Sequence, residues 1–326
     1  MTNRSGFQKA TLGRTGLRVS RLGLASNGVC RRDVEWAVDQ GINYLYWGSL
    51  RRPDFGAAVR HLARSRRAEL VVVVQTYTRV AALVRPSVEV ALRRLGLDHA
   101  DVLLLGWWNE PPDARILEAA RRVCEAGKAR HLMISCHQRA TFQRYIADPT
   151  YGAIMVRYNA AHPGAETEVF PHLGPGAARS GAGVSALLRP GVVTYTATRW
   201  GALLDPRLIP PGERAPRGSD CYRFALTHPA VDIALCGAKT TDELREALAA
   251  LERGPMSADE LAWMKRVGAG VRSASASRSG NPLIYLLDRW TRVADPGGRT
   301  APEPHATLSD EDRRSMNGVP VNGVHD

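Results

Sequence analysis

Short apolar segments alternate with longer amphipathic segments along most of the sequence, and this alternation constrains the fold more than any other feature. The apolar segments have the length of strands, as at Glu69–Val74 and Asp101–Leu105, and those between them have helical spacing, as at Ala114–Glu125. Strands separated by helices of about 10 to 15 residues pair in parallel, because each helix returns the chain to the same end of the sheet. About eight such units in about 240 residues predict an α/β fold, a (β/α)8 TIM barrel.

The two ends of the chain depart from this alternation. Two glycine turn signals in residues 12–24 predict an N-terminal hairpin around the entry to the first barrel strand, Leu22–Ala25. Near the other end, Ser257 and Glu260 form a capping box that predicts one more helix, through Val271. Periodicity is lost after that helix. We therefore expect a barrel over residues 1–272 and a largely mobile C-terminal extension over residues 273–326.

One other architecture and one other environment are disfavoured by what the sequence lacks. A doubly wound open sheet would show the same alternation, but its Gly-x-Gly-x-x-Gly fingerprint after the first strand is missing. No apolar run approaches the roughly 20 residues that cross a bilayer, so we expect no membrane partner. The five cysteines are irregularly spaced and form no Cys-x-x-Cys pair, which favours a cytoplasmic location.

The chain is strongly basic, with a formal net charge of +12. Such a balance raises nucleic acid as a partner. However, the arginines occur as pairs along predicted surface helices with Glu and Asp between them, and no nucleic-acid motif is present, so we expect no specific nucleic-acid binding. Lysine is scarce, because 40 of the 44 basic residues are Arg and the four lysines are Lys9, Lys128, Lys239 and Lys265.

Seven segments in the right order resemble the aldo-keto reductase family, over about 260 residues. They are LGRTGLRVSRLGL (12–24), AVDQGINYLYWGS (37–49), LGLDHADVLLL (95–105), EAGKARHLMIS (125–135), VRYN (156–159), TYTATRWGALLDP (194–206) and HPAVDIALCGAKTTDELREAL (228–248). The resemblance implies a (β/α)8 barrel that binds NADPH at the C-terminal ends of the strands without a Rossmann motif. It also implies a small-molecule carbonyl or alcohol as substrate.

The catalytic Asp, Tyr, Lys and His of that family are not matched. The Asp position falls on Tyr46 and the Tyr position on Arg51, while the Lys falls on Gln75 or Thr76 and the His on Gly106. The loss of the Lys does not depend on the alignment, because no Lys occurs between Lys9 and Lys128. The usual mechanism, in which the Lys lowers the pKa of a proton-donating Tyr, is therefore unsupported.

The positions that the family uses for its cofactor are matched in part. Ser135 matches the Ser after the fifth strand, while the neighbouring Asn and the Gln of the sixth strand are replaced by Cys136 and Met155. The remaining matches are Tyr195, which would stack on nicotinamide, and the phosphate-end residues Gly237, Lys239, Thr240 and Glu243. Thr240 and Glu243 form a capping box, and a helix N-terminus favours anions. The same box is also the ordinary start of a helix, and Tyr195 and Ser135 also suit the interior of a barrel.

Aromatic residues take the places that the missing catalytic residues leave at the strand ends. The predicted substrate pocket contains Trp47, Tyr77, Trp107 and Trp108, which follow the C-terminal ends of strands. Tyr46 is the candidate proton donor and Arg51 the cation that would lower its pKa. Aromatic walls with a fixed cation suit a flat or anionic small molecule. The alternative is that these aromatic residues only fill space.

Two functions remain open at this point. The first is an NADPH-dependent oxidoreductase with a non-standard proton donor. The second is a catalytically silent barrel that binds a nucleotide or metabolite and acts as a regulatory or partner subunit. A metal site is not expected, because Cys136 and His137 point to opposite sides of a strand and no third ligand lies at metal spacing.

Overall fold

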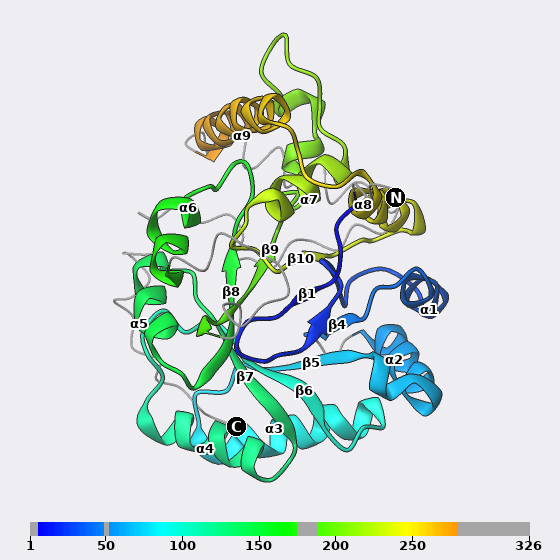
Figure 1. Cartoon of the computed structure of the whole chain (residues 1–326), viewed down its shortest axis with the longest axis vertical. Helices are drawn as coiled ribbons and strands as arrows, with labels where there is room; N and C mark the ends of the chain where they lie inside the picture. Colours follow the sequence, from blue (N-terminus) through cyan, green and yellow to red (C-terminus); the bar gives the residue numbers. More distant parts are fainter. Residues whose placement is uncertain (1–5, 49–51, 175–187, 280–326) are drawn as a thin grey trace, which may run out of the picture.

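The computed structural model describes residues 6–48, 52–174 and 188–279, with the backbone alone for residues 276–279. Eight parallel strands close into a barrel in the order β10-β3-β4-β5-β6-β7-β8-β9 (Figure 1). The predicted TIM barrel is therefore confirmed. Its strands are β3 (Leu22–Ala25), β4 (Tyr44–Trp47), β5 (Val71–Thr76), β6 (Ala100–Leu105), β7 (Ala129–Ser135), β8 (Tyr151–Arg157), β9 (Gly191–Tyr195) and β10 (Ile233–Cys236).

Helices follow the strands and cover the outside of the barrel. They are α1 (Arg31–Asp39), α2 (Pro53–Arg66), α3 (Ala81–Leu95), α4 (Ala114–Glu125), α5 (Phe142–Ala147), α6 (Ala165–Glu168), α7 (Gly218–Thr227), α8 (Thr241–Arg253) and α9 (Ala258–Ser279). The predicted N-terminal hairpin is present, because β1 (Ala10–Thr11) pairs antiparallel with β2 (Arg18–Val19). Within the described part of the chain, no helix is both long and apolar enough to span a bilayer.

Two helices are longer than the sequence pattern predicts. The apolar spacing predicts a helix over Val88–Leu97. α3 instead begins at Ala81, seven residues earlier, and contains Pro86 within its second turn. α9 continues past the predicted end at Val271 to Ser279, because its Ser- and Ala-rich second half keeps helical geometry without an apolar stripe. The proposed domain boundary at residue 272 thus falls inside a helix. The rest of the predicted extension, residues 280–326, lies outside the described residues.

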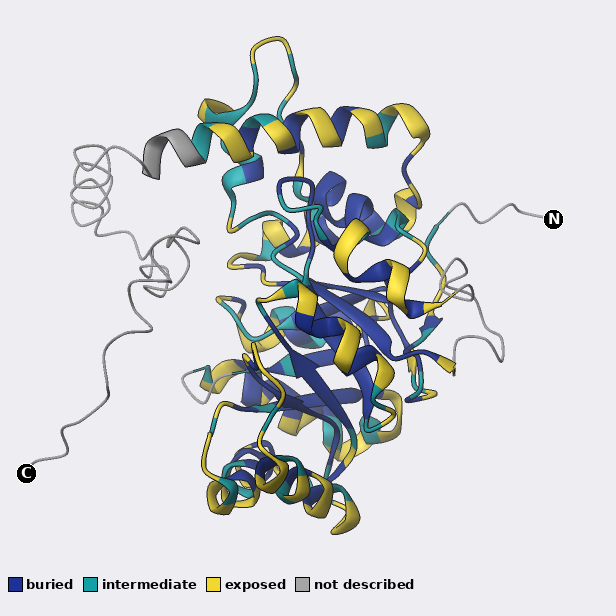
Figure 2. Ribbon diagram, turned by 90° about the vertical axis from the view of Figure 1, so that its left-hand side faces the viewer, coloured by how far each residue is buried: buried dark blue, intermediate teal, exposed yellow. Residues whose placement is uncertain are grey.

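The core has two layers, separated by the wall of the barrel. Alternate strand residues point inward and form the barrel interior, which includes Tyr44, Val73, Leu104, Met133 and Val193. The residues between them point outward and pack under the helices in a larger cluster. Figure 2 shows the buried strands at the centre and the exposed residues on the outer faces of the helices. This strict alternation decides which strand-end side chains reach the mouth of the barrel.

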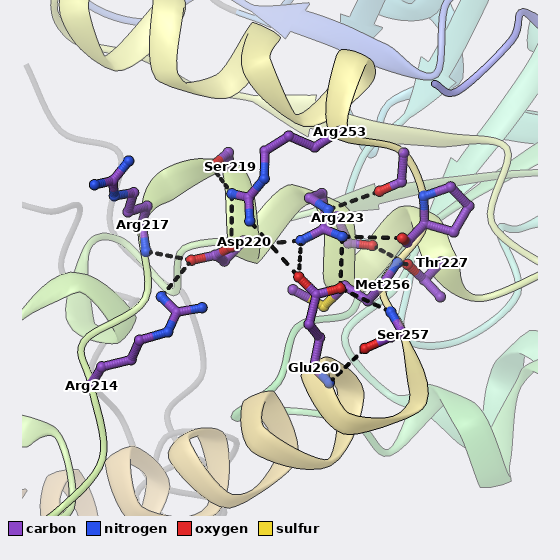
Figure 3. Close-up of polar contacts among 12 residues, drawn as sticks. Arg214, Arg217, Ser219, Asp220, Arg223, Thr227, Arg253, Met256, Ser257 and Glu260 are labelled. Carbon is purple, nitrogen blue, oxygen red and sulfur yellow. Dashed lines mark hydrogen bonds and ion pairs between the residues drawn. The ribbon is translucent and has the colours of Figure 1, made fainter. Parts of the chain in front are cut away.

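An ion-pair cluster joins α9 to α7 and α8 (Figure 3). Asp220, in the first turn of α7, is fully buried, and its carboxylate lies 2.9 Å from a guanidinium nitrogen of Arg253 and 3.2 Å from one of Arg214. One turn later, the buried Arg223 pairs with Glu260 of α9 at 2.5 Å. The cluster holds the start of α9 against the barrel.

Candidate active site

Five aromatic side chains gather at the C-terminal end of the barrel. Tyr46 lies near the end of β4, Tyr77, Trp107 and His137 follow β5, β6 and β7, and Tyr195 ends β9. Ring centroids lie 5.1 Å apart for Tyr77 and Trp107, 5.6 Å for Trp107 and His137, and 6.3 Å for His137 and Tyr195. The hydroxyl of Tyr46 hydrogen-bonds the side chain of Tyr77. We call these five residues the aromatic arc; it borders the end of the barrel where enzymes of this fold carry their sites.

Trp107 is presented to solvent by a strained turn. Its φ of 59° lies in the left-handed region, which is rare for a bulky residue, and its side chain is 41% exposed. Its N–H donates to the hydroxyl of Ser135 at 3.0 Å, and Arg79 donates to its carbonyl oxygen at 2.5 Å. A bulky side chain held in this way against its backbone preference points to a functional role, here as a surface on which a ligand can stack.

Tyr46 is a half-buried member of the aromatic arc, and its environment keeps it neutral. Burial raises its pKa well above the ordinary value of 10.0, and the neighbouring tyrosines, including Tyr77 through its hydrogen bond, raise it further. The described surroundings therefore raise this pKa, whereas the predicted role of Arg51 is to lower it, and that role stays a prediction. The cation predicted to lower it, Arg51, lies outside the described residues. Tyr46 can donate a hydrogen bond at any physiological pH, but it is a weak acid.

Two tryptophans predicted for the substrate pocket lie elsewhere. Trp47 follows Tyr46 directly on β4 and so points to the opposite side of the strand, where its indole packs against Gly56 of α2. Trp108 is carried outward by the turn at Trp107 and lies under Arg79, whose guanidinium stacks 3.8 Å from the indole centroid. Both belong to the cluster between the barrel and the helices. Trp47 and Trp108 therefore do not line the predicted substrate pocket, whereas Tyr77 and Trp107 lie at the mouth of the barrel.

Gly106 stands where the resemblance places the catalytic His, and the space beside it is filled. A Cβ added to Gly106 would lie 2.6 Å from the ring of Tyr77 and 2.8 Å from the amide nitrogen of Gln75. Atoms at such distances clash, so a larger residue at position 106 requires Tyr77 or Gln75 to move. The mouth is thus repacked around a glycine, with Tyr77 in the place of the missing side chain.

The residues predicted to hold a nicotinamide ring are only partly available. Tyr195 is half-buried at the mouth, and Gly237 borders open space, since a Cβ added there would meet only one atom, at 3.5 Å. Ser135 is 5% exposed and accepts the hydrogen bond from Trp107, which leaves its hydroxyl proton free to donate elsewhere. Cys136 is buried facing the Gln138 carbonyl, and Met155 offers no amide. The carboxamide end therefore retains fewer polar partners than the family pattern has.

The residues predicted to meet a phosphate lie together where α8 begins. Thr240 is the N-cap of α8 and accepts a hydrogen bond from the Glu243 N–H at 3.2 Å, as predicted for the capping box. Glu243 in turn accepts the Lys239 N–H at 2.7 Å. Because that N–H is already bonded, the exposed ammonium group of Lys239 is the donor left for an anion. Gly28 packs closely against the Lys239 backbone and joins this turn to the loop after β3.

Two residues at the mouth were missed as site candidates from the sequence. His137 belongs to the arc, while its neighbour Cys136 is buried on the other side of the strand. Arg157 ends β8 on the inward side, two residues after Met155. Both follow an inward-facing residue at a spacing of two, which is the signal that finds them. Helix and strand assignments alone do not find them, because neither residue falls on a catalytic or cofactor position of the family.

Two hollows on the described surface lie away from the mouth. One, of about 310 Å³, lies between α1, α2 and α3 against the outer side of Trp47, and another of about 310 Å³ lies between α7 and α8 beside Asp220. Among the described residues, no three His, Cys, Asp or Glu side chains are grouped so that they could hold a metal ion.

The sequence matches no protein-family model. Several solved structures nevertheless have this fold. An aldo-keto reductase from Bacillus halodurans in its holo form is 20% identical, with a TM-score of 0.66 over 80% of this chain and 96% of that chain. Aldo-keto reductases from Klebsiella pneumoniae, one in complex with NADP and acetate and one with NADPH, are also 20% identical over 81% of this chain and 96% of theirs, with TM-scores of 0.65 and 0.63. The likeness to aldo-keto reductases that the sequence motifs predict is thus confirmed for the fold.

Proposed function

We propose that the protein is an NADPH-dependent oxidoreductase of the aldo-keto reductase type, which acts on a small-molecule carbonyl or alcohol with a non-standard proton donor. The observation that carries this proposal is the aromatic arc, which borders the functional end of a barrel whose solved neighbours hold NADP or NADPH. The small molecule would stack on the exposed faces of Trp107 and Tyr77.

The residues around the mouth fit NADPH better at its phosphate end than at its nicotinamide end. The ammonium group of Lys239, beside the N-terminus of α8, would pair with the 2′-phosphate. Tyr195 would stack on the nicotinamide, and Ser135 would donate to its carboxamide. Gly237 leaves the backbone open to close approach. When bound, NADPH would supply the hydride that reduces a carbonyl.

Tyr46 is the proton donor that we propose. It remains neutral because of its raised pKa, so it can donate a hydrogen bond to a carbonyl oxygen and stabilise the negative charge that develops there. Tyr77, its hydrogen-bond partner, connects it to the exposed part of the arc. The role of Arg51 as an additional cation remains a proposal.

The test is single-turnover oxidation of bound NADPH in the presence of a panel of aldehydes and ketones. We expect Tyr46→Phe to slow the oxidation by about 100-fold, the lower range for loss of a general acid, without changing NADPH affinity. Tyr151→Phe is the matched control, because Tyr151 is a buried tyrosine at the opposite end of the barrel. An unchanged rate in Tyr46→Phe removes Tyr46 as the donor.

The filling of the space at Gly106 favours the second function, a barrel that binds the nucleotide without catalysis. Tyr77 and Gln75 occupy the place of the family His, and Gln75 or Thr76 takes that of the Lys. A protein that binds NADPH but oxidises it with no compound of the panel would favour this function. Such a barrel would act as a regulatory or partner subunit.

A further inference from the structure

The hollow between α1, α2 and α3 is bordered by basic side chains from all three helices. Arg31 begins α1, Arg60 and Arg64 lie one turn apart on α2, and Arg94 lies in the last turn of α3. His61 of α2 also borders the hollow, and none of the described residues that line it is acidic. A volume of about 310 Å³ is at the lower end of the range for small-molecule sites. The hollow therefore has the charge and the size to receive a small anion.

Three of the four arginines have no carboxylate partner in the described part of the chain. The exception is Arg31, which pairs with Glu35 on the next turn of α1 at 2.6 Å. The other three are Arg60, Arg64 and Arg94. Elsewhere on the same helices, by contrast, Arg66 and Arg85 do pair with carboxylates. Three guanidinium groups without a counter-charge around one concave surface strengthen the positive potential there, because the protein walls focus the field.

Packing holds one guanidinium group and one wall of the hollow in place. The guanidinium of Arg60 donates to the backbone carbonyl of Arg94, and a Cβ added to Gly96 would lie only 3.2 Å from the Arg60 Cγ. Arg60 is therefore fixed between α2 and α3 before any ligand binds. The buried indole of Trp47 also lines the hollow and packs against Gly56. Groups that are already ordered lose less conformational entropy when a ligand binds.

We propose that this hollow binds a small molecule that bears a diphosphate group, held by the guanidinium groups of Arg60, Arg64 and Arg94. Guanidinium groups bind phosphate oxygens through paired hydrogen bonds, and groups from two helices can contact two linked phosphates. A single phosphate would leave part of the positive charge unpaired. The site lies on the outer side of the barrel wall, away from the mouth, and the inference does not depend on the proposed oxidoreductase function.

The compact shape of the cluster favours a small anion over a nucleic-acid strand. A strand follows an extended basic groove or stripe, whereas these arginines surround one hollow of about 310 Å³. Carboxylate-bearing pairs also interrupt the positive surface beside it, as with Arg66 and its partners Asp39 and Glu69. We therefore expect a diphosphate to bind in preference to an oligonucleotide.

The experiment is isothermal titration of the full chain with inorganic pyrophosphate and, separately, with orthophosphate, at about 0.15 M salt without divalent cations. We expect pyrophosphate to bind at least about tenfold more tightly than orthophosphate. The double variant Arg64→Gln/Arg94→Gln should lose at least about tenfold in pyrophosphate affinity. Both side chains are exposed, and the backbone carbonyl that holds Arg60 is kept, so the fold should be unchanged.

Arg93→Gln is the matched control, because Arg93 is the exposed neighbour of Arg94 on α3 and does not line the hollow. Pyrophosphate affinity should be unchanged in this variant and in Lys239→Ala, which alters the phosphate position proposed at α8. Absence of pyrophosphate binding, equal affinity for pyrophosphate and orthophosphate, or a loss in either control that equals the loss in the double variant would overturn the proposal. A single-stranded oligonucleotide that binds more tightly than pyrophosphate, and loses affinity in the double variant, would also overturn it by assigning the hollow to nucleic acid.

Discussion

Tyr46 shows how the environment of one residue limits the chemistry at the mouth. Its phenol is half-buried, is hydrogen-bonded to the side chain of Tyr77 and has a pKa raised above the ordinary value of 10.0. A tyrosine activated by a nearby cation would instead have a lowered pKa and lose its proton near neutral pH. The described surroundings thus favour a neutral hydrogen-bond donor over an activated acid.

The pH dependence of turnover follows from this direction of the pKa shift. A raised pKa means that the neutral phenol persists as the pH rises, so proton donation by Tyr46 should be constant from about pH 7 to about pH 10. The measurement is kcat/KM for carbonyl reduction across that range, with Tyr46→Phe as reference. A loss of activity with a midpoint between about pH 7 and about pH 8 in the wild type alone would show that the pKa is lowered.

The sequence predicted members of the aromatic arc only where an aromatic residue at the end of a strand also faces the inside of the barrel. Tyr77 and Trp107 follow strands and lie at the mouth, as the sequence predicts. Trp47 and Trp108 also stand at strand ends, but alternation and the turn at Trp107 direct them under the helices. The φ of 59° at Trp107 has no signature in the sequence, because glycine, the usual residue for that conformation, is absent at this position.

At the scale of elements, the hydrophobic pattern predicted each of the barrel strands to within a few residues. The pattern is strong because strands buried on both sides are nearly continuous apolar runs, as in Val71–Thr76 and Ala100–Leu105. Helix ends were less predictable where the local signal is weak or misleading. Pro86 makes the start of α3 difficult to predict from the sequence. A proline near the start of a helix is tolerated, but in a sequence it indicates that the helix is interrupted.

The contact between α7 and α9 leads to a prediction about stability. Glu260 pairs with the buried Arg223, and hydrogen bonds from Arg223 lower the pKa of Glu260 to about 2. Replacement by Gln should lower the free energy of unfolding at neutral pH by about 2 kcal/mol, because the buried Arg223 then loses the nearer of its two carboxylate partners, the other being Asp220 at 3.8 Å. Urea denaturation of Glu260→Gln and wild type measures this difference.

The effect of Glu260→Gln should depend on pH with a defined sign. A depressed pKa contributes stability above the unfolded value of about 4.5, and this contribution is lost as the pH falls through about 2. The two proteins should therefore converge in acid. Asp242→Asn is the control, since its partner Arg245 and its own side chain are exposed, and its midpoint should match that of the wild type. A difference between Glu260→Gln and wild type that persists at pH 2 would contradict the ion-pair explanation.

For the whole molecule, the fold and the site are separable. Of the positions at which the family pattern is lost, Tyr46 borders the barrel interior and Gly106 lies just beyond the end of β6, so a stable barrel tolerates a different set of residues at its mouth. The net charge of +12 belongs largely to surface arginines, several of which pair with carboxylates, as Arg66 does with Asp39 and Glu69. The absence of specific nucleic-acid binding stays a prediction.

We propose that the mouth binds NADPH although the family's catalytic residues are replaced. Isothermal titration of the full chain with NADPH and NADH measures this binding. We expect one NADPH per chain with a Kd of about 1 μM, weaker binding of NADH, and a loss of about tenfold in NADPH affinity in Lys239→Ala. Lys265→Ala, which breaks a surface pair with Glu166, should bind as the wild type does. No binding of NADPH by the wild type would rule out the proposed cofactor site, and equal affinity for NADPH and NADH would rule out the pairing of Lys239 with the 2′-phosphate.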